Sequence, residues 1–133
     1  MKPRLYAENE TEFESNGLGP LSDALACTVE ENRNGAFELT MDYPVTGALF
    51  DELKHGSIIF APANDSGTPQ PFRVCEKSTP LSGVVTIRAK HISYQLSHIP
   101  VSPFAAGSCT AALQGLKSHA AEQCPFEFWT DKE

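Results

Sequence analysis

ALACTVEENRNGAFELTMDYP, residues 24–44, is the stretch that decides the fold. Two β-prone runs flank Asn34 and Gly35, a dipeptide that is strongly typical of two-residue hairpin turns. In both runs apolar side chains recur at every second position, so one face packs inward while the other meets water or a partner. The stretch predicts a hairpin whose inward-facing residues are Leu25, Cys27, Val29, Phe37, Leu39, Met41 and Tyr43.

Further short strands are expected in the first hundred residues, at 57–63, 72–78 and 83–90. In the second of these runs, Phe72, Val74 and Glu76 are expected on one face because alternate residues of a strand point the same way. Residues 47–56 predict a short helix that Gly56 stops. Short strands with turns between them favour a small, mostly antiparallel sheet that curls into a barrel.

The remainder of the chain changes character. Helical apolar spacing continues through Leu96 until Pro100, and residues 107–125 predict a second helix that Ser108 or Thr110 caps. Residues 125–130 alternate as a strand does and run into the end of the chain. We expect a mainly β fold with α (α+β), in which 1–100 form a β-barrel domain. Residues 101–133 would then begin a second α+β subdomain in a truncated chain.

The composition is that of a globular protein. The chain has 133 residues, 41% of them hydrophobic and 20% charged, which suits one compact core. No stretch reaches the roughly twenty apolar residues that span a bilayer, and the first residues lack the apolar core of a secretion signal, so no membrane insertion is expected. The net charge of −7 comes with scattered basic residues, which excludes a conventional nucleic-acid binder.

The cysteines show no metal-binding pattern. Cys27, Cys75, Cys109 and Cys124 have neither a C-x-x-C pair nor the paired spacing of a zinc site. A chain of this size does not need disulfides to hold its core. We therefore expect four buried free thiols that behave as small hydrophobic groups.

Two histidines raise the question of a catalytic or metal site. A helix would place His91, Tyr94 and His98 on one stripe, but a metal needs at least one more ligand and only Gln95 lies nearby. A nucleophile built from Cys109 with His119 as its base fails on distance, because ten residues along a helix span about 15 Å. We expect packing roles for the histidines, no catalytic residue, no metal and no cofactor.

The acidic stretch AENETEFE places Glu8, Glu10, Glu12 and Glu14 at every second position. In an extended chain all four side chains would point one way. Catalytic carboxylates converge across a cleft from different elements, so these residues predict an acidic edge that discourages strand pairing.

Several motifs together resemble one protein family. They are LYAENETEFESNGLGPLSDA, CTVEENRNGAFELTMDYPVTG, LKHGSIIFAPA, QPFRVCEKS, IRAKHISYQLSHIPVSPF and ALQGLKS, in this order and spacing. With them the chain resembles the amino-terminal region of siphophage tail-tip hub proteins. These are also called tail-associated lysins or prophage endopeptidase tail proteins.

The resemblance implies a structural role at the tip of a virion tail. It implies a baseplate-hub β-barrel, a homotrimer that docks on the distal tail protein, contact with the tape-measure protein, and synthesis in the bacterial host cytoplasm. DNA would pass through without specific binding, and Glu8, Glu10, Glu12 and Glu14 would line an acidic channel that repels phosphate. Relatives can carry a separate peptidoglycan hydrolase domain, but these residues supply no catalytic groups.

Two other functions remain open. One is a peptidase or cell-wall hydrolase domain, which would hydrolyse a substrate and lose that activity when its nucleophile is mutated. The other is a host-surface carbohydrate-binding module, for which Tyr94, Phe104 and Trp129 would have to form an exposed row.

Overall fold

A computed structural model describes residues 2–64 and 67–132 of the chain. The chain divides into two compact units, Met1–Ile92 and Ser93–Glu133. The strands and helices are β1 Arg4–Tyr6, β2 Gly19–Pro20, β3 Ala26–Glu31, β4 Phe37–Pro44, β5 Ile58–Pro62, β6 Pro69–Lys77, β7 Val84–His91, the 3₁₀-helix η1 Ile92–His98 and the α-helix α1 Cys109–Ser118.

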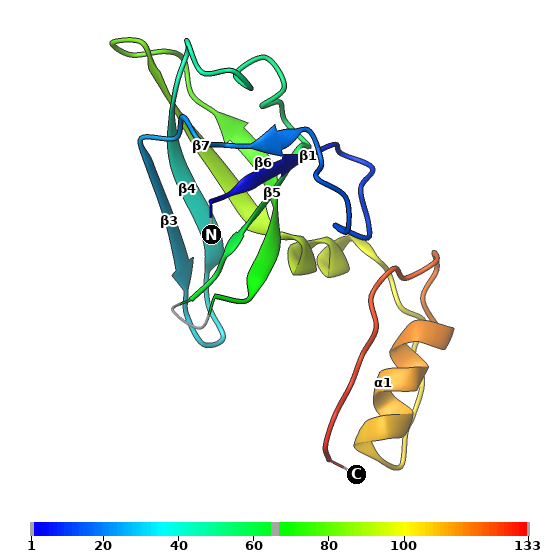
Figure 1. The fold of residues 1–133 in the computed structure, drawn as a ribbon. Helices are drawn as coiled ribbons and strands as arrows, with labels where there is room; N and C mark the ends of the chain where they lie inside the picture. The colour runs from blue at the N-terminus through cyan, green and yellow to red at the C-terminus, as the bar shows by residue number, and fades with distance from the viewer. Residues whose placement is uncertain (1, 65–66, 133) are drawn as a thin grey trace. The chain divides into compact units, whose positions relative to one another are not determined.

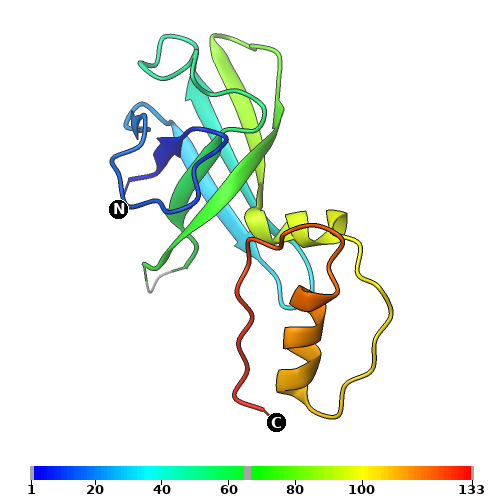
Figure 2. The same cartoon turned by 90° about the vertical axis from the view of Figure 1, so that its right-hand side faces the viewer.

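The first unit is built on one antiparallel sheet. In the described residues its seven strands follow the order β2-β1-β5-β6-β7-β4-β3, with β3 at one margin (Figure 1). The sheet curls strongly, as the turned view shows (Figure 2). Within the described ranges no ladder joins β3 to β2, so the strands make a curled half-barrel with two margins. The mainly β, α+β prediction is confirmed at this level.

The predicted hairpin is confirmed, with β3 and β4 paired in register from Ala26 opposite Asp42 to Glu31 opposite Phe37. Its turn differs from the predicted two-residue turn. Gly35 N–H donates to Asn32 O at 2.9 Å, and the left-handed residue is Asn34, with φ 57°.

The core lies on one face of the sheet, which we call the inner face. Leu39 of β4 lies opposite Ala89 of β7, which in turn lies opposite Val74 of β6, and all three are fully buried. On β4 the predicted alternation is therefore confirmed for Leu39, Met41 and Tyr43. The core cluster consists of Leu5, Leu21, Leu39, Met41, Tyr43, Leu53, Ile59, Ala61, Phe72, Val74, Val85, Ile87 and Ala89.

The inward set predicted for the first arm of the hairpin is wrong in part. Leu25 is 63% exposed and Cys27 is exposed, while Val29 is half-buried. Cys27 lies opposite the buried Met41, so its side chain belongs to the inner face, and within the described residues no strand pairs with β3 on its other side. The core is therefore thinnest along β3.

Strand β6 contains a bulge that reverses the predicted alternation. The register with β7 shifts between Val74 and Glu76, so that Cys75 is the extra residue. Glu76 consequently lies opposite exposed Arg88 and not on the inner face with Val74, and the prediction that placed them together is wrong.

The helix predicted over 47–56 is also wrong, because this segment is a succession of turns. Two of its first N–H groups are taken by side chains from outside the segment: Ala48 N–H donates to Asp23 Oδ2 at 2.9 Å, and Leu49 N–H to the Tyr43 hydroxyl at 3.2 Å. A Cβ at Gly47 would overlap the Tyr43 ring, which fixes the chain close to that side chain.

The second unit contains α1, which confirms a helix within the predicted range 107–125, although α1 ends at Ser118 and not near Pro125. The Ser108 hydroxyl accepts a hydrogen bond from Ala111 N–H, so Ser108 and not Thr110 is the N-cap. The strand predicted over 125–130 is wrong, because this segment joins no ladder within the described residues. Cys124 is buried, and Glu127 forms an ion pair with Lys117 of α1.

Candidate functional site

The acidic residues lie in a loop that covers residues 7–18 between β1 and β2. The loop is not extended as predicted: Glu10 N–H donates to Ala7 O at 3.2 Å, and Phe13 adopts a left-handed φ of 55°. The alternation that would align Glu8, Glu10, Glu12 and Glu14 on one face is therefore absent. Their role as an acidic channel or edge face stays a prediction.

Glu10 has a structural role inside this loop. Its Oε1 accepts hydrogen bonds from the backbone N–H groups of Thr11, Glu12 and Phe13, at 3.0, 3.0 and 3.4 Å. These hydrogen bonds, chiefly those from Glu12 and Thr11, favour the charged form and lower the pKa of the Glu10 carboxyl. One of the four acids is thus engaged with its own backbone.

Arg73 fastens the loop to the sheet. Its Nη1 donates to Glu8 O at 3.0 Å and to Gly56 O at 2.8 Å, which joins the acidic loop to the turn before β5. Beside this junction lies a hollow of about 230 Å³ lined by Ala7, Glu8, Leu18, Glu52, Lys54, His55 and Ser57. Sequence reasoning missed Arg73, because its two partners are far from it along the chain.

His91 is a packed residue at the end of β7. Its ring stacks on Phe37 at 4.3 Å between centroids, meets the edge of Phe72, and places Nε2 3.1 Å from Gln70 Oε1. Burial lowers the pKa of its imidazole. Tyr94 and His98 lie on η1, where three residues make a turn, so the predicted single stripe does not form. These contacts agree with a packing role for His91.

The described cysteines are all free, and only Cys124 is buried, so the prediction of four buried thiols is wrong. Cys109 is the first residue of α1 and His119 is the C-cap of the same helix, so the two side chains lie at opposite ends of α1. His119 stacks on Phe104 and places Nδ1 3.0 Å from Gly115 O. Nowhere in residues 2–64 and 67–132 do three His, Cys, Asp or Glu side chains come together as metal ligands.

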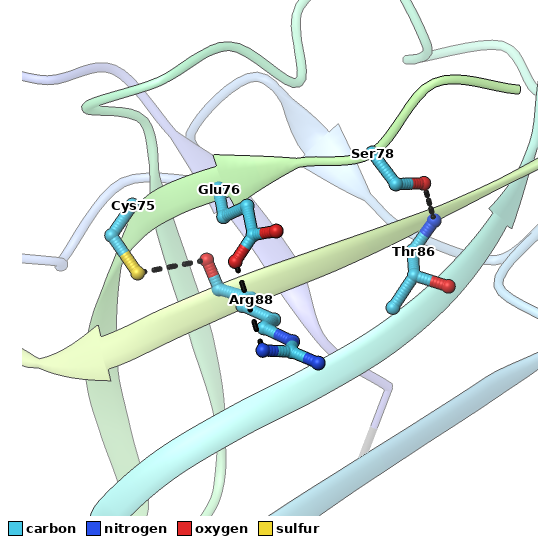
Figure 3. A network of polar contacts seen from close by, with 5 residues as sticks. All are labelled: Cys75, Glu76, Ser78, Thr86 and Arg88. Carbon is cyan, nitrogen blue, oxygen red and sulfur yellow. Dashed lines mark hydrogen bonds and ion pairs between the residues drawn. The ribbon is translucent and has the colours of Figure 1, made fainter.

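The outer face of the sheet carries polar pairs, shown in Figure 3. Glu76 Oε2 lies 3.7 Å from Arg88 Nη1 across β6 and β7, and the Cys75 thiol lies 3.4 Å from Arg88 O. At the next position the Ser78 hydroxyl accepts from Thr86 N–H at 2.9 Å. The ion pair is exposed on both sides, so it orders the surface with little effect on stability.

The aromatic residues of the second unit do not form an exposed row. Trp129 is 85% exposed, but Tyr94 and Phe104 are half-buried. Phe104 lies over Gly115 and against His119.

The margin of β3 is a feature that sequence reasoning missed. Asn32 N–H donates to Ala36 O at 2.8 Å, which makes the even-numbered residues of β3 the hydrogen-bonded partners of β4. The backbone N–H and C=O groups of Cys27, Val29 and Glu31 therefore point away from β4. In the described part of the chain no strand lies on that side.

No family model, curated protein or solved structure matches the chain. No helix in the described ranges has both the length and the apolar character that crossing a bilayer requires.

Proposed function

We propose that this protein is a structural component of a phage or prophage tail tip, where copies of its half-barrel form the ring of a baseplate hub. In this proposal the chain closes the tail tube as a homotrimer, docks on the distal tail protein and contacts the tape-measure protein. Its part is assembly and not catalysis.

The observation that carries the proposal is the curled sheet with an unpaired margin. A sheet that curls this far buries a core on its inner face but leaves β3 exposed there. Such a margin is an aggregation hazard for a free protein and is useful in an assembly. The resemblance of the hairpin, QPFR and HISYQL motifs to tail hubs supports the same role.

Closure of the barrel belongs to this proposal. Leu21 is buried and its N–H donates to Pro3 O, while Leu25 N–H donates to Asp42 O, so the segment between β2 and β3 passes from one margin to the other. We expect contacts with a neighbouring protein of the tail, and not with a second copy at the β3 margin, to complete the barrel that this segment begins.

The test is the location of the protein in virions. Tails purified after induction from the bacterium that carries the gene should contain the chain, and antibodies against it should label the tip in electron micrographs. Labelling along the tube, or particles that lack the chain, would contradict the proposal.

The acidic loop gives a separate test of the channel. Glu8, Glu12 and Glu14 can be replaced by lysine together while Glu10 keeps its backbone hydrogen bonds. Because a positive wall would hold phosphate, genome ejection should slow while tails still assemble. The matched control replaces the same residues by glutamine. Normal ejection by the lysine variant would exclude an acidic channel.

A further inference from the structure

We infer that the free margin of β3 binds an extended strand from another polypeptide, one that alternates apolar with basic side chains. The margin offers the backbone N–H and C=O groups of Cys27, Val29 and Glu31, which is the pattern that strand addition uses. This inference does not depend on the tail-hub proposal.

The inner face supplies the reason for apolar side chains. Cys27 and Val29 lie opposite Met41 and Leu39, both fully buried, yet Cys27 is exposed and Val29 only half-buried. Leu25, just before β3, is 63% exposed. A strand placed beside β3 would cover these side chains with its own alternate residues and extend the core.

The outer face supplies the reason for basic side chains. Glu30 lies directly opposite Glu38, and like charges at such positions destabilise a sheet. Lys90 of β7 lies opposite Glu38 on its other side, which balances that carboxylate. Within the described residues, Glu30 Oε1 accepts a hydrogen bond from the neutral Asn32 amide at 2.6 Å. A lysine or arginine on the added strand, opposite Glu30, would place a basic side chain next to Glu30 as Lys90 is placed opposite Glu38.

The sheet already contains one strand of this chemistry. On β7, Ile87 and Ala89 are buried on the inner face, while Arg88 and Lys90 are exposed on the outer face. It pairs with β4 from Val84 to Lys90. The strand that suits β3 thus has the same pattern of side chains as the strand that β4 binds on its other edge.

A second copy of this chain suits the margin less well. The opposite margin, β2, has two residues and ends in Pro20, which has no N–H to donate. Pairing β3 with β3 would bring together two acidic strands of a chain whose net charge is −7. Charge therefore favours a basic strand from a different polypeptide.

The experiment uses the full chain and a short capped peptide that alternates valine with lysine. Hydrogen exchange is followed by NMR at single amides. Binding should slow exchange at Cys27, Val29 and Glu31 by about tenfold or more, while Ala26 and Thr28, already bonded to β4, change little. A peptide that alternates valine with glutamate should have no effect.

Variants of β3 separate backbone pairing from simple attraction of charge. Val29→Pro removes one outward N–H at an edge position that tolerates proline, and should abolish binding, whereas the control Val29→Ala should retain it. If the proline variant fails to fold, a peptide N-methylated on the amides that face β3 gives the same test. Glu30→Lys should reverse the preference to the glutamate peptide.

Three results would overturn the inference. They are equal binding by the proline variant or the methylated peptide, equal binding of both peptides, and slow exchange at Cys27, Val29 and Glu31 that grows with protein concentration in the absence of peptide. The last result would identify a second copy as the occupant.

Discussion

Among single residues, Arg73 joins two loops of the first unit that are far from it along the chain. Its guanidinium bonds to Glu8 O, 65 positions away, and to Gly56 O, 17 positions away. Arg73 lies on the outer face of β6, between the inward-facing Phe72 and Val74. Its partners could not be predicted, because they are backbone atoms of loops whose paths depend on the whole fold.

Replacement of Arg73 by methionine keeps the apolar stem and removes both hydrogen bonds. We expect a loss of about 1–2 kcal/mol in the free energy of unfolding, since hydrogen bonds from charged donors contribute more than neutral ones. Faster proteolysis within residues 7–18 should accompany it. Urea unfolding and limited proteolysis measure the two effects.

Arg88→Met is the matched control, because Arg88 makes an exposed ion pair at 3.7 Å. It should change the free energy of unfolding by less than about 1 kcal/mol. Equal losses in both variants would mean that Arg73 does not hold the loop.

His91 should make the stability of the first unit depend on pH. Burial lowers the pKa of its imidazole in the folded state below the ordinary value of 6.5. As the pH falls through that value the unfolded chain binds the proton first, so stability is lost until the pH reaches the folded-state pKa. Urea unfolding at about pH 7.5 and about pH 5.5 should therefore show a smaller difference in His91→Phe than in the natural chain.

The phenylalanine variant keeps a ring for stacking on Phe37 but cannot titrate. His55→Phe, at an exposed position, serves as the control and should keep the full pH dependence. An unchanged dependence in His91→Phe would assign the effect to other groups.

At the scale of elements, the hairpin was predictable because local pattern and turn chemistry agree there. Alternation identified β4 and β7, and a capping residue with apolar spacing identified α1. The strands β1 and β2 escaped prediction because three and two residues are too short to show a period. The segment 47–56 was misjudged because side chains from outside it take the N–H groups of Ala48 and Leu49, and the bonds that follow, such as Phe50 N–H to Gly47 O, form separate turns.

The turn of the hairpin gives a prediction about its left-handed residue. Asn34→Ala should cost about 1 kcal/mol, because a Cβ without a polar side chain is strained at φ 57°. Asn34→Gly should cost no more than a few tenths of a kcal/mol, since glycine adopts this conformation freely. Chemical denaturation measures both, with Arg33→Ala in the same turn as the control. A larger loss from Arg33→Ala than from Asn34→Ala would contradict this account.

At the scale of the whole molecule, the core cluster belongs entirely to the first unit, between Leu5 and Ala89. A chain that ends at Ile92 should therefore fold, with a free energy of unfolding within about 1 kcal/mol of that of the first unit in the full chain. Thermal unfolding and the amide NMR spectrum of the shortened chain test this. Loss of a cooperative transition would show that the first unit needs residues 93–133.

The division at Ile92 lies inside the predicted domain 1–100, and the role of residues 101–133 as the beginning of a second subdomain stays a prediction. The sequence predicts a change of character near this point, because short alternating runs give way to helical spacing. Curvature was expected from the many short strands. The open margin was not predicted, because alternation shows which face is apolar and not whether a neighbour covers it.

The extra residue at Cys75 changes which positions of β6 face the core. Before it, odd-numbered side chains such as Arg73 leave the core; after it, odd-numbered Lys77 turns inward, where its Nζ bonds to the carbonyls of Phe50 and Leu53 and lies over the Phe50 ring. Deleting Cys75 would remove the bulge and leave Glu76 opposite Arg88 and Lys77 opposite Ile87, whereas regular pairing of Cys75 with β7 would send Lys77 to solvent and Glu76 toward the interior. The residues that follow Cys75 in β6 thus face as they do because one position is left out of the pairing with β7, and the chemical identity of the side chain at that position matters less than its exclusion from the ladder.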